Sequence, residues 1–204
     1  MNPTLCLLSA LGVISVLPSA ASAATAWTVA PDASHLTFET SQSGRPIHGE
    51  FQKFTPTITF DKADLAGSHI KVDIDTSSAK TGDKTNDSSL PGKDWFQVAT
   101  FPRATFESTA ITDKGTAQDG GENYEAAGKL TILGVTRDVV LPFTLKTENG
   151  ATRATGSLAI KRLDYGMGAL IDPNGTMVSN DVTVTFDLSA SPTIPAVPAT
   201  PDKE

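Results

Sequence analysis

Hydrophobic and polar residues alternate along most of the chain, a pattern typical of β-strands with one buried face. The clearest case is residues 69–75, where Ile70, Val72 and Ile74 share one face and polar residues occupy the other. The same period of two predicts seven further strands, over residues 35–40, 47–60, 103–111, 126–133, 137–148, 153–162 and 181–189. Pro56 and the change of parity between Phe51 and Phe54 predict an irregularity within 47–60.

Two turns organise the centre of the chain. Gly134 separates the runs 126–133 and 137–148, and Asn149-Gly150 separates the second run from 153–162. An Asn-Gly pair favours a type I′ hairpin because both residues tolerate positive φ. These three strands are therefore predicted to form an antiparallel meander, whereas residues 113–123 are rich in Gly and Asp and predict a loop.

The alternation stops between residues 76 and 100, where small polar residues surround Leu90, Trp95 and Phe96. Pro91-Gly92 divides this stretch. We expect a short helical insert around residues 82–98. Its two aromatic residues either cap one end of the fold and gate entry to its interior, or simply pack the insert onto the sheet.

Eight strands with short connections predict an all-β fold with antiparallel neighbours. Closing the sheet into an eight-stranded antiparallel barrel removes its exposed edges. Such a barrel encloses an interior that side chains fill or that holds one small ligand. A two-sheet sandwich is the alternative architecture.

The inward faces of these strands and the aromatic pair of the insert supply an apolar lining. The candidates are Leu36, Phe38, Phe51, Phe60, Ile70, Val72, Ile74, Trp95, Phe96, Phe106, Leu130, Ile132, Leu158, Ile160, Val184 and Phe186, with Leu141, Phe143 and Leu145 as further members. These residues either fill a core or form the wall of a tunnel for a hydrocarbon chain. The alternation itself does not distinguish the two.

Residues 1–23 have the features of a cleaved signal peptide. A short apolar run over residues 5–17 precedes Ala21-Ser22-Ala23, and the run is too short to span a bilayer. The only cysteine, Cys6, lies in this segment, so the mature domain over residues 24–190 is predicted to have no disulfide. Prolines recur every third residue in 191–204, which predicts a disordered tail.

The charge balance excludes one class of partner. The chain carries 16 Lys and Arg residues against 23 Asp and Glu residues, a formal net charge of −7. Nucleic-acid binding needs a basic face, so we expect no nucleic-acid partner.

The polar residues offer little chemistry. His35, His48 and His69 match no metal-ligand spacing, and Asp73 and Asp75 lie on an outward strand face. No nucleophile elbow occurs. We therefore predict no catalytic residue, no metal site and no enzyme activity.

Three cations near strand ends are candidates for contacts with the polar head group of a ligand. They are Arg137, Lys161 and Arg162. Surface ion pairing is the alternative role for each of them.

Several blocks, in this order and spacing, resemble the YceI-like family of exported, lipocalin-like, polyisoprenoid-binding proteins. They include residues 32–38, 49–51, 95–96, 101–108, 161–168 and 182–184, with Gly128-Lys129-Leu130-Thr131-Ile132-Leu133-Gly134-Val135-Thr136 as the most distinctive. The resemblance covers residues 27–190. It implies an elongated barrel with an apolar tunnel that takes an isoprenoid, an isoprenoid quinone or a fatty amphiphile.

The resemblance also implies a periplasmic location in a Gram-negative bacterium and a membrane b-type cytochrome as a partner. We therefore expect a periplasmic carrier or sequestering protein, a monomer or a homodimer, whose bound lipid takes the place of a cofactor. An enzyme or stress-response accessory acting on such a lipid or quinone is the alternative. A filled barrel whose Pro-rich tail docks to a membrane partner is the third hypothesis.

Overall fold

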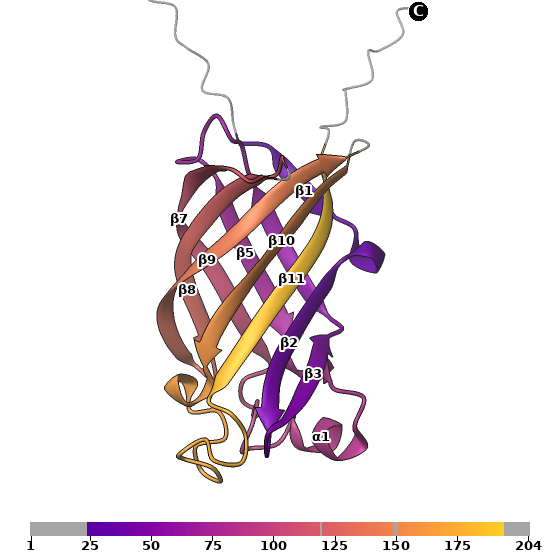
Figure 1. Ribbon diagram of the computed structural model, residues 1–204, viewed down its shortest axis with the longest axis vertical. Helices are drawn as coiled ribbons and strands as arrows, with labels where there is room; N and C mark the ends of the chain where they lie inside the picture. The colour runs from indigo at the N-terminus through magenta and orange to yellow at the C-terminus, as the bar shows by residue number, and fades with distance from the viewer. Residues whose placement is uncertain (1–23, 119, 149–150, 194–204) are drawn as a thin grey trace, which may run out of the picture.

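The computed structural model describes residues 24–118, 120–148 and 151–193, which form one antiparallel sheet of eleven strands (Figure 1). The strands are β1 (Ala26–Val29), β2 (His35–Gln42), β3 (Arg45–Phe51), β4 (Phe54–Thr59), β5 (His69–Asp75), β6 (Ala79–Lys80), β7 (Arg103–Thr116), β8 (Glu122–Ile132), β9 (Val135–Glu148), β10 (Ala151–Lys161) and β11 (Asp181–Pro192). Short helical segments are η1 (Pro31–Ala33), η2 (Thr76–Ser78), α1 (Lys84–Ser89) and η3 (Arg162–Tyr165).

The sheet closes on itself. Strands β1, β4, β5, β7, β8, β9, β10 and β11 follow one another around the barrel, and β1 pairs again with β11. Strand β2 pairs with a different part of β11, so β1 and β2 are two halves of one broken strand, as are β3 and β4. The eight-stranded antiparallel barrel predicted from the sequence is confirmed, and the sandwich alternative is wrong.

The predicted strand 47–60 is interrupted at a different place from the one that Pro56 indicated. The break lies at Gln52 and Lys53, between β3 and β4, which agrees with the parity change at Phe51 and Phe54. Pro56 lies within β4 opposite Val72. Only β5 pairs with β4 at this point, because the pairing of β1 with β4 extends no farther than Ile58. Pro56 therefore lies at an edge-like position, where a residue without an N–H group is tolerated.

The predicted meander is present. Leu133 and Gly134 connect β8 to β9 with φ angles of 51° and 74°, as a two-residue type I′ turn requires. Glu148 pairs with Ala151 across the next hairpin, whose turn, Asn149-Gly150, lies outside the described residues.

The predicted loop over 113–123 is shorter than expected. Strand β7 continues to Thr116 and β8 begins at Glu122, with register shifts after Ser108 and after Asp113. These irregularities conceal the strand in the sequence, because a bulge changes which residues share a face.

The helical insert is present as α1, six residues long, near one end of the barrel (Figure 1). Asp83 begins it by accepting hydrogen bonds from the main-chain N–H groups of Thr85 and Asn86, each at 2.9 Å. No helix within residues 24–118, 120–148 and 151–193 is long and apolar enough to cross a membrane.

Strand β11 runs on to Pro192, so the barrel extends two residues into the segment predicted as a disordered tail. Ser191 and Pro192 pair with Thr28 and Trp27 of β1 and help to close the barrel. The predicted signal peptide 1–23 and residues 194–204 lie outside the described residues, and both of these assignments stay predictions.

Candidate ligand-binding cavity

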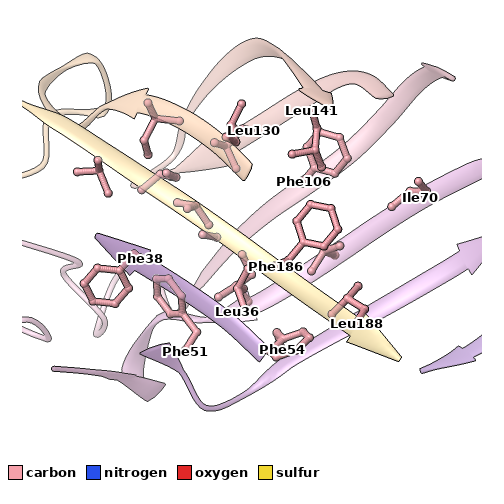
Figure 2. A pocket seen from close by; sticks show the side chains of 18 of the residues that line it. Leu36, Phe38, Phe51, Phe54, Ile70, Phe106, Leu130, Leu141, Phe186 and Leu188 are labelled. Carbon is pink, nitrogen blue, oxygen red and sulfur yellow. The ribbon is translucent and has the colours of Figure 1, made fainter. Parts of the chain in front are cut away.

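The barrel encloses an elongated cavity with a volume of about 220 Å³ (Figure 2). Every strand of the closed ring contributes to its wall, together with β2, β3 and the insert. All of the predicted lining residues face it, namely Leu36, Phe38, Phe51, Phe60, Ile70, Val72, Ile74, Trp95, Phe96, Phe106, Leu130, Ile132, Leu158, Ile160, Val184 and Phe186. Their contact with a ligand stays a prediction.

Other lining residues were predicted as further candidates or were missed. Leu141, Phe143 and Leu145 of β9 line the cavity. Phe54 and Ile58 of β4 also line it, although they were not selected. The change of parity between Phe51 and Phe54 in the sequence could have indicated that they face inward, because the break at residues 52–53 turns Phe54 back toward the interior.

The cavity wall offers almost no polar group. Its only described polar side chains apart from the indole rings are Thr40, Thr152 and Arg162, and each is already bonded within the protein. Thr40 Oγ1 donates to the Asp181 carbonyl at 3.0 Å, and Thr152 Oγ1 lies 2.9 Å from Thr147 Oγ1. An interior whose hydroxyl and guanidinium groups are bonded within the protein favours a hydrocarbon occupant over water.

Phenylalanine rings lie flat against the wall because glycines face them from neighbouring strands. The pairs are Phe38 with Gly49, Phe106 with Gly128 and Phe186 with Gly156. A Cβ atom at Gly49 would lie 2.1 Å from the Phe38 ring, and one at Gly156 would lie 2.7 Å from the Phe186 ring. The glycines thus let large rings cover the wall without crossing the lumen.

Aromatic packing closes the end of the barrel where β4 ends and β8 begins. The rings of Phe60, Tyr124 and Phe143 are buried and lie 5.2 to 6.4 Å apart between centroids. Trp27 Nε1 donates to the Phe60 carbonyl at 2.9 Å. Burial, followed by the nearby Glu122 carboxylate, raises the pKa of Tyr124 to about 12.

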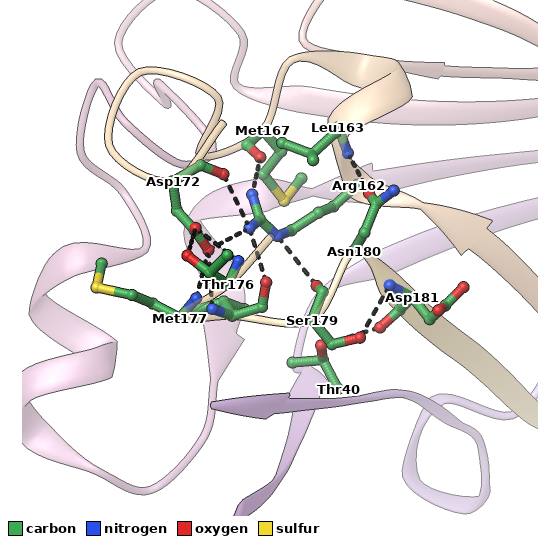
Figure 3. A network of polar contacts seen from close by, with 11 residues as sticks. Thr40, Arg162, Leu163, Met167, Asp172, Thr176, Met177, Ser179, Asn180 and Asp181 are labelled. Carbon is green, nitrogen blue, oxygen red and sulfur yellow. Dashed lines mark hydrogen bonds and ion pairs between the residues drawn. The ribbon is translucent and has the colours of Figure 1, made fainter. Parts of the chain in front are cut away.

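A buried cation closes the opposite end (Figure 3). Arg162 is 1% exposed, and its guanidinium donates to the carbonyls of Ser179, Met167 and Val178 at 3.1, 2.7 and 2.8 Å. Nη2 also donates to Asp172 Oδ2 at 2.7 Å. Arg162 therefore holds the loop between η3 and β11 against the end of the cavity.

Asp172 organises the same loop. Its carboxylate accepts hydrogen bonds from the main-chain N–H groups of Thr176, Met177 and Val178 at 2.8 to 3.1 Å. The hydrogen bond from Val178, followed by those from Thr176 and Met177, outweighs desolvation and lowers the pKa of Asp172 to about 2.

The aromatic pair of the insert packs at this end. Phe96 meets the Phe51 ring edge-on, with centroids 5.8 Å apart, and Trp95 lies 5.6 Å from the Arg162 guanidinium carbon. Gly168 N donates to the Asp94 carbonyl at 2.7 Å, which joins the loop to the insert. These rings cover an end of the cavity by packing the insert onto it, and their gating of entry stays a prediction.

The predicted head-group cations do not meet at one place. Arg137 is exposed and donates to the Asp164 carbonyl at 2.9 Å, and Lys161 is exposed and pairs with Asp181. Neither residue lines the cavity. Arg162 lines it, but protein acceptors occupy its guanidinium. The alternation of polar and apolar residues could not show that Lys161 is exposed and Arg162 is buried, since both occur where the strand ends.

The histidines lie on the outer surface. His35, His48 and His69 each approach a glutamate, at 2.9, 3.0 and 3.4 Å. Within the part of the chain that the structure describes, no group of three or more His, Cys, Asp or Glu side chains could hold a metal ion. Asp73 and Asp75 face an outer groove and not the central cavity.

A closed antiparallel barrel around an apolar cavity defines a lipocalin-like binding fold. The family model for the YceI-like domain matches residues 27–190, and the chain belongs to this family.

Curated relatives extend beyond the matched region. A UPF0312 protein of Yersinia pestis is 32% identical over 142 residues, and one of Pseudomonas syringae is 31% identical over 147 residues. These matches cover 70% and 69% of this chain. The chain spans 65% of the Yersinia protein's length and 72% of the Pseudomonas protein's length.

Solved structures share the fold. BcnA of Burkholderia cenocepacia is 33% identical with a TM-score of 0.72, covering 79% of this chain and 99% of that one. A polyisoprenoid binding domain from Saccharophagus degradans, implicated in plant cell wall breakdown, is 21% identical with a TM-score of 0.63, covering 83% and 99%. The Campylobacter jejuni YCEI protein is 23% identical with a TM-score of 0.60, covering 72% and 85%.

Proposed function

We propose that this protein is a periplasmic carrier or sequestering protein that buries the tail of a long-chain isoprenoid, isoprenoid quinone or related amphiphile in its barrel. One observation carries the proposal: the cavity runs along the barrel and has a wall of apolar side chains, in which Thr40, Thr152 and Arg162 are already bonded within the protein. Each methylene group moved from water into such a wall contributes about 0.8 kcal/mol.

The size of the cavity favours a chain over a bulky ligand. Pockets for drug-sized molecules span roughly 300–1,000 Å³, whereas this cavity has about 220 Å³. A single extended hydrocarbon chain is thin enough to enter a narrow lumen and can contact its apolar wall along the whole length. The polyisoprenoid-binding domain that shares the fold supports an isoprenoid as the tail.

Binding without catalysis is the function that the cavity supports best. Arg162 is the only titratable side chain among the described lining residues, and its donors are engaged with Ser179, Met167, Asp172 and Val178. General acid–base or nucleophilic chemistry needs a titratable or nucleophilic group beside the ligand. The arrangement therefore favours a carrier over an enzyme.

Native mass spectrometry tests the proposal. The protein, purified without detergent from a Gram-negative host, should carry a lipid that raises its mass and leaves on denaturation. Stripped protein should take up geranylgeraniol. Leu158→Trp, which fills the lumen, should lose this uptake, whereas Val140→Trp introduces the same ring at an outward position that is 52% exposed and should retain it. Stripped wild-type protein that takes up no geranylgeraniol would contradict the proposal.

A further inference from the structure

The barrel wall has an interruption between the broken strands. The pairing of β1 with β4 ends at Trp27 and Ile58, and the pairing of β2 with β3 begins at Thr37 and Glu50. Between these pairs, residues 28–36 face residues 51–57 with no strand pairing. We call this interruption the seam.

Proline on both sides removes two of the main-chain donors that could close the seam by hydrogen bonds. Pro31 begins η1 on one side and Pro56 lies in β4 on the other, and neither has an N–H to donate. Main-chain groups of Gln52 and Lys53 turn away from the seam to η2, where Ser78 O accepts from Gln52 N at 3.2 Å and Ser78 Oγ accepts from Lys53 N at 3.0 Å. The seam is thus a feature of the sequence.

An outer groove of about 1120 Å³ follows the seam. Phe51 and Phe54 are the only described residues that line both this groove and the central cavity. Figure 2 shows both rings at the border of the cavity. These two side chains therefore separate the lumen from the outside at the seam.

The two rings are held differently. Phe51 is 7% exposed and packs against Phe38 and Phe96, with ring centroids 5.2 and 5.8 Å away. Phe54 is only half-buried, and no aromatic ring pair within residues 24–118, 120–148 and 151–193 includes it. Rotation of Phe54 therefore breaks none of these ring pairs, whereas rotation of Phe51 breaks two.

The two ends of the barrel are harder to open. One end requires separation of the buried rings of Phe60, Tyr124 and Phe143. The other requires loss of the buried Arg162–Asp172 pair with its attached hydrogen bonds. Breaking a buried ion pair is strongly unfavourable.

Building on the proposed carrier function, we propose that the seam is the entrance through which the ligand tail reaches the cavity, with Phe54 as the side chain that opens it. The polar head of the ligand then remains in the outer groove. Charged and titratable groups line this groove, namely Asp32, Glu50, Asp73, Asp75, Lys53, Arg103 and His35. Carboxylates outnumber the lysine and arginine by two. A ligand with an uncharged head group should therefore pass along the groove more readily than one with a carboxylate head group.

Stopped-flow fluorescence with cis-parinaryl alcohol, a linear polyene alcohol, tests the entrance. Phe54→Ala should raise the association rate about tenfold, and it should raise the dissociation rate by at least as much because Phe54 also lines the cavity. Phe54→Trp should slow both rates. Phe106→Ala, which alters the cavity away from the groove, should change dissociation alone. Phe54→Leu provides a smaller truncation, and circular dichroism checks that each variant is folded.

A second comparison tests passage along the charged groove. With cis-parinaric acid at low salt, Asp73→Asn should increase the association rate about twofold, and added salt should remove the gain. Asp138→Asn makes the same change in net charge on β9, outside the groove, and should have less effect.

Two outcomes separate the proposals. If wild-type protein binds cis-parinaryl alcohol but the Phe54 variants change only dissociation, as Phe106→Ala does, the entrance is not at the seam and the carrier function stands. Equal effects of Asp73→Asn and Asp138→Asn would contradict passage of the head along the groove. If wild-type protein binds no alcohol at equilibrium, the carrier function fails, and the entrance with it.

Discussion

The Arg162 guanidinium and the Asp172 carboxylate form an ion pair of 2.7 Å between side chains that are 1% and 2% exposed. The pair joins the end of β10 to the loop that leads into β11. Figure 3 shows the pair within its network of hydrogen bonds. Arg162 lines the cavity where it meets that loop, so the pair bounds the lumen at this end.

Replacing Arg162 should strongly destabilise the protein. Arg162→Met keeps an unbranched apolar stem but removes the guanidinium, which leaves Asp172 without its cation and three carbonyls without their donor. Loss of one partner of a buried pair costs about 3–5 kcal/mol of unfolding free energy, which urea denaturation followed by tryptophan fluorescence will measure. Arg137→Met removes an exposed cation and should cost less than about 1 kcal/mol. Equal costs for the two variants would contradict the assigned role of Arg162.

The depressed pKa of Asp172 predicts a particular loss of stability in acid. Its folded pKa is about 2 against an ordinary value of 3.8, so its ionised form stabilises the fold fully above about pH 4. That stabilisation is lost as the pH falls from about 4 through 2. Urea midpoints measured over this range should fall more steeply for the wild type than for Asp172→Asn. Parallel curves for the two proteins would contradict the assignment.

Alternation along the sequence predicted the barrel and its lining well, because a strand with one buried face must repeat every two residues. For residues such as Ile70, Val72 and Ile74, the alternating pattern alone indicates which side chains face the interior. The break at Gln52 and Lys53 is less visible, because it depends on hydrogen bonds to Ser78, 25 residues away.

The end of the cavity could not be predicted in the same way. Arg162 follows a strand and Asp172 lies in a Gly-rich loop without periodicity, so neither position indicates burial. Their pairing depends on how the loop folds back between η3 and β11. The sequence therefore pointed to Arg162 as a head-group ligand, whereas the structure shows its guanidinium bonded to the protein.

The two tyrosines of the chain should both ionise late. Burial is the main cause that raises the pKa of Tyr124, to about 12, and that of Tyr165. Native protein at pH 10 should therefore show little phenolate absorbance, whereas protein unfolded in urea should be about half ionised. Since the folded state favours the neutral phenol, these residues stabilise the fold below pH 10 and lose that contribution as the pH rises toward 12. Tyr124→Phe should remove the step near pH 12. Native phenolate absorbance equal to that of the unfolded chain would contradict burial of the rings.

The contact between Phe38 and Gly49 should control the width of the lumen. A methyl group at residue 49 would lie 2.1 Å from the Phe38 ring, and its three nearest heavy atoms all belong to that ring. In Gly49→Ala the ring must therefore move toward the cavity. Overpacking of this kind costs about 1–3 kcal/mol, and we expect affinity for cis-parinaryl alcohol to fall about tenfold, which corresponds to about 1.4 kcal/mol. Phe38→Leu in the Gly49→Ala background should restore binding, because the smaller side chain vacates the space. A fluorescence titration of the four proteins of this double-mutant cycle measures the coupling, and additive effects on affinity would show that the ring does not mediate the change.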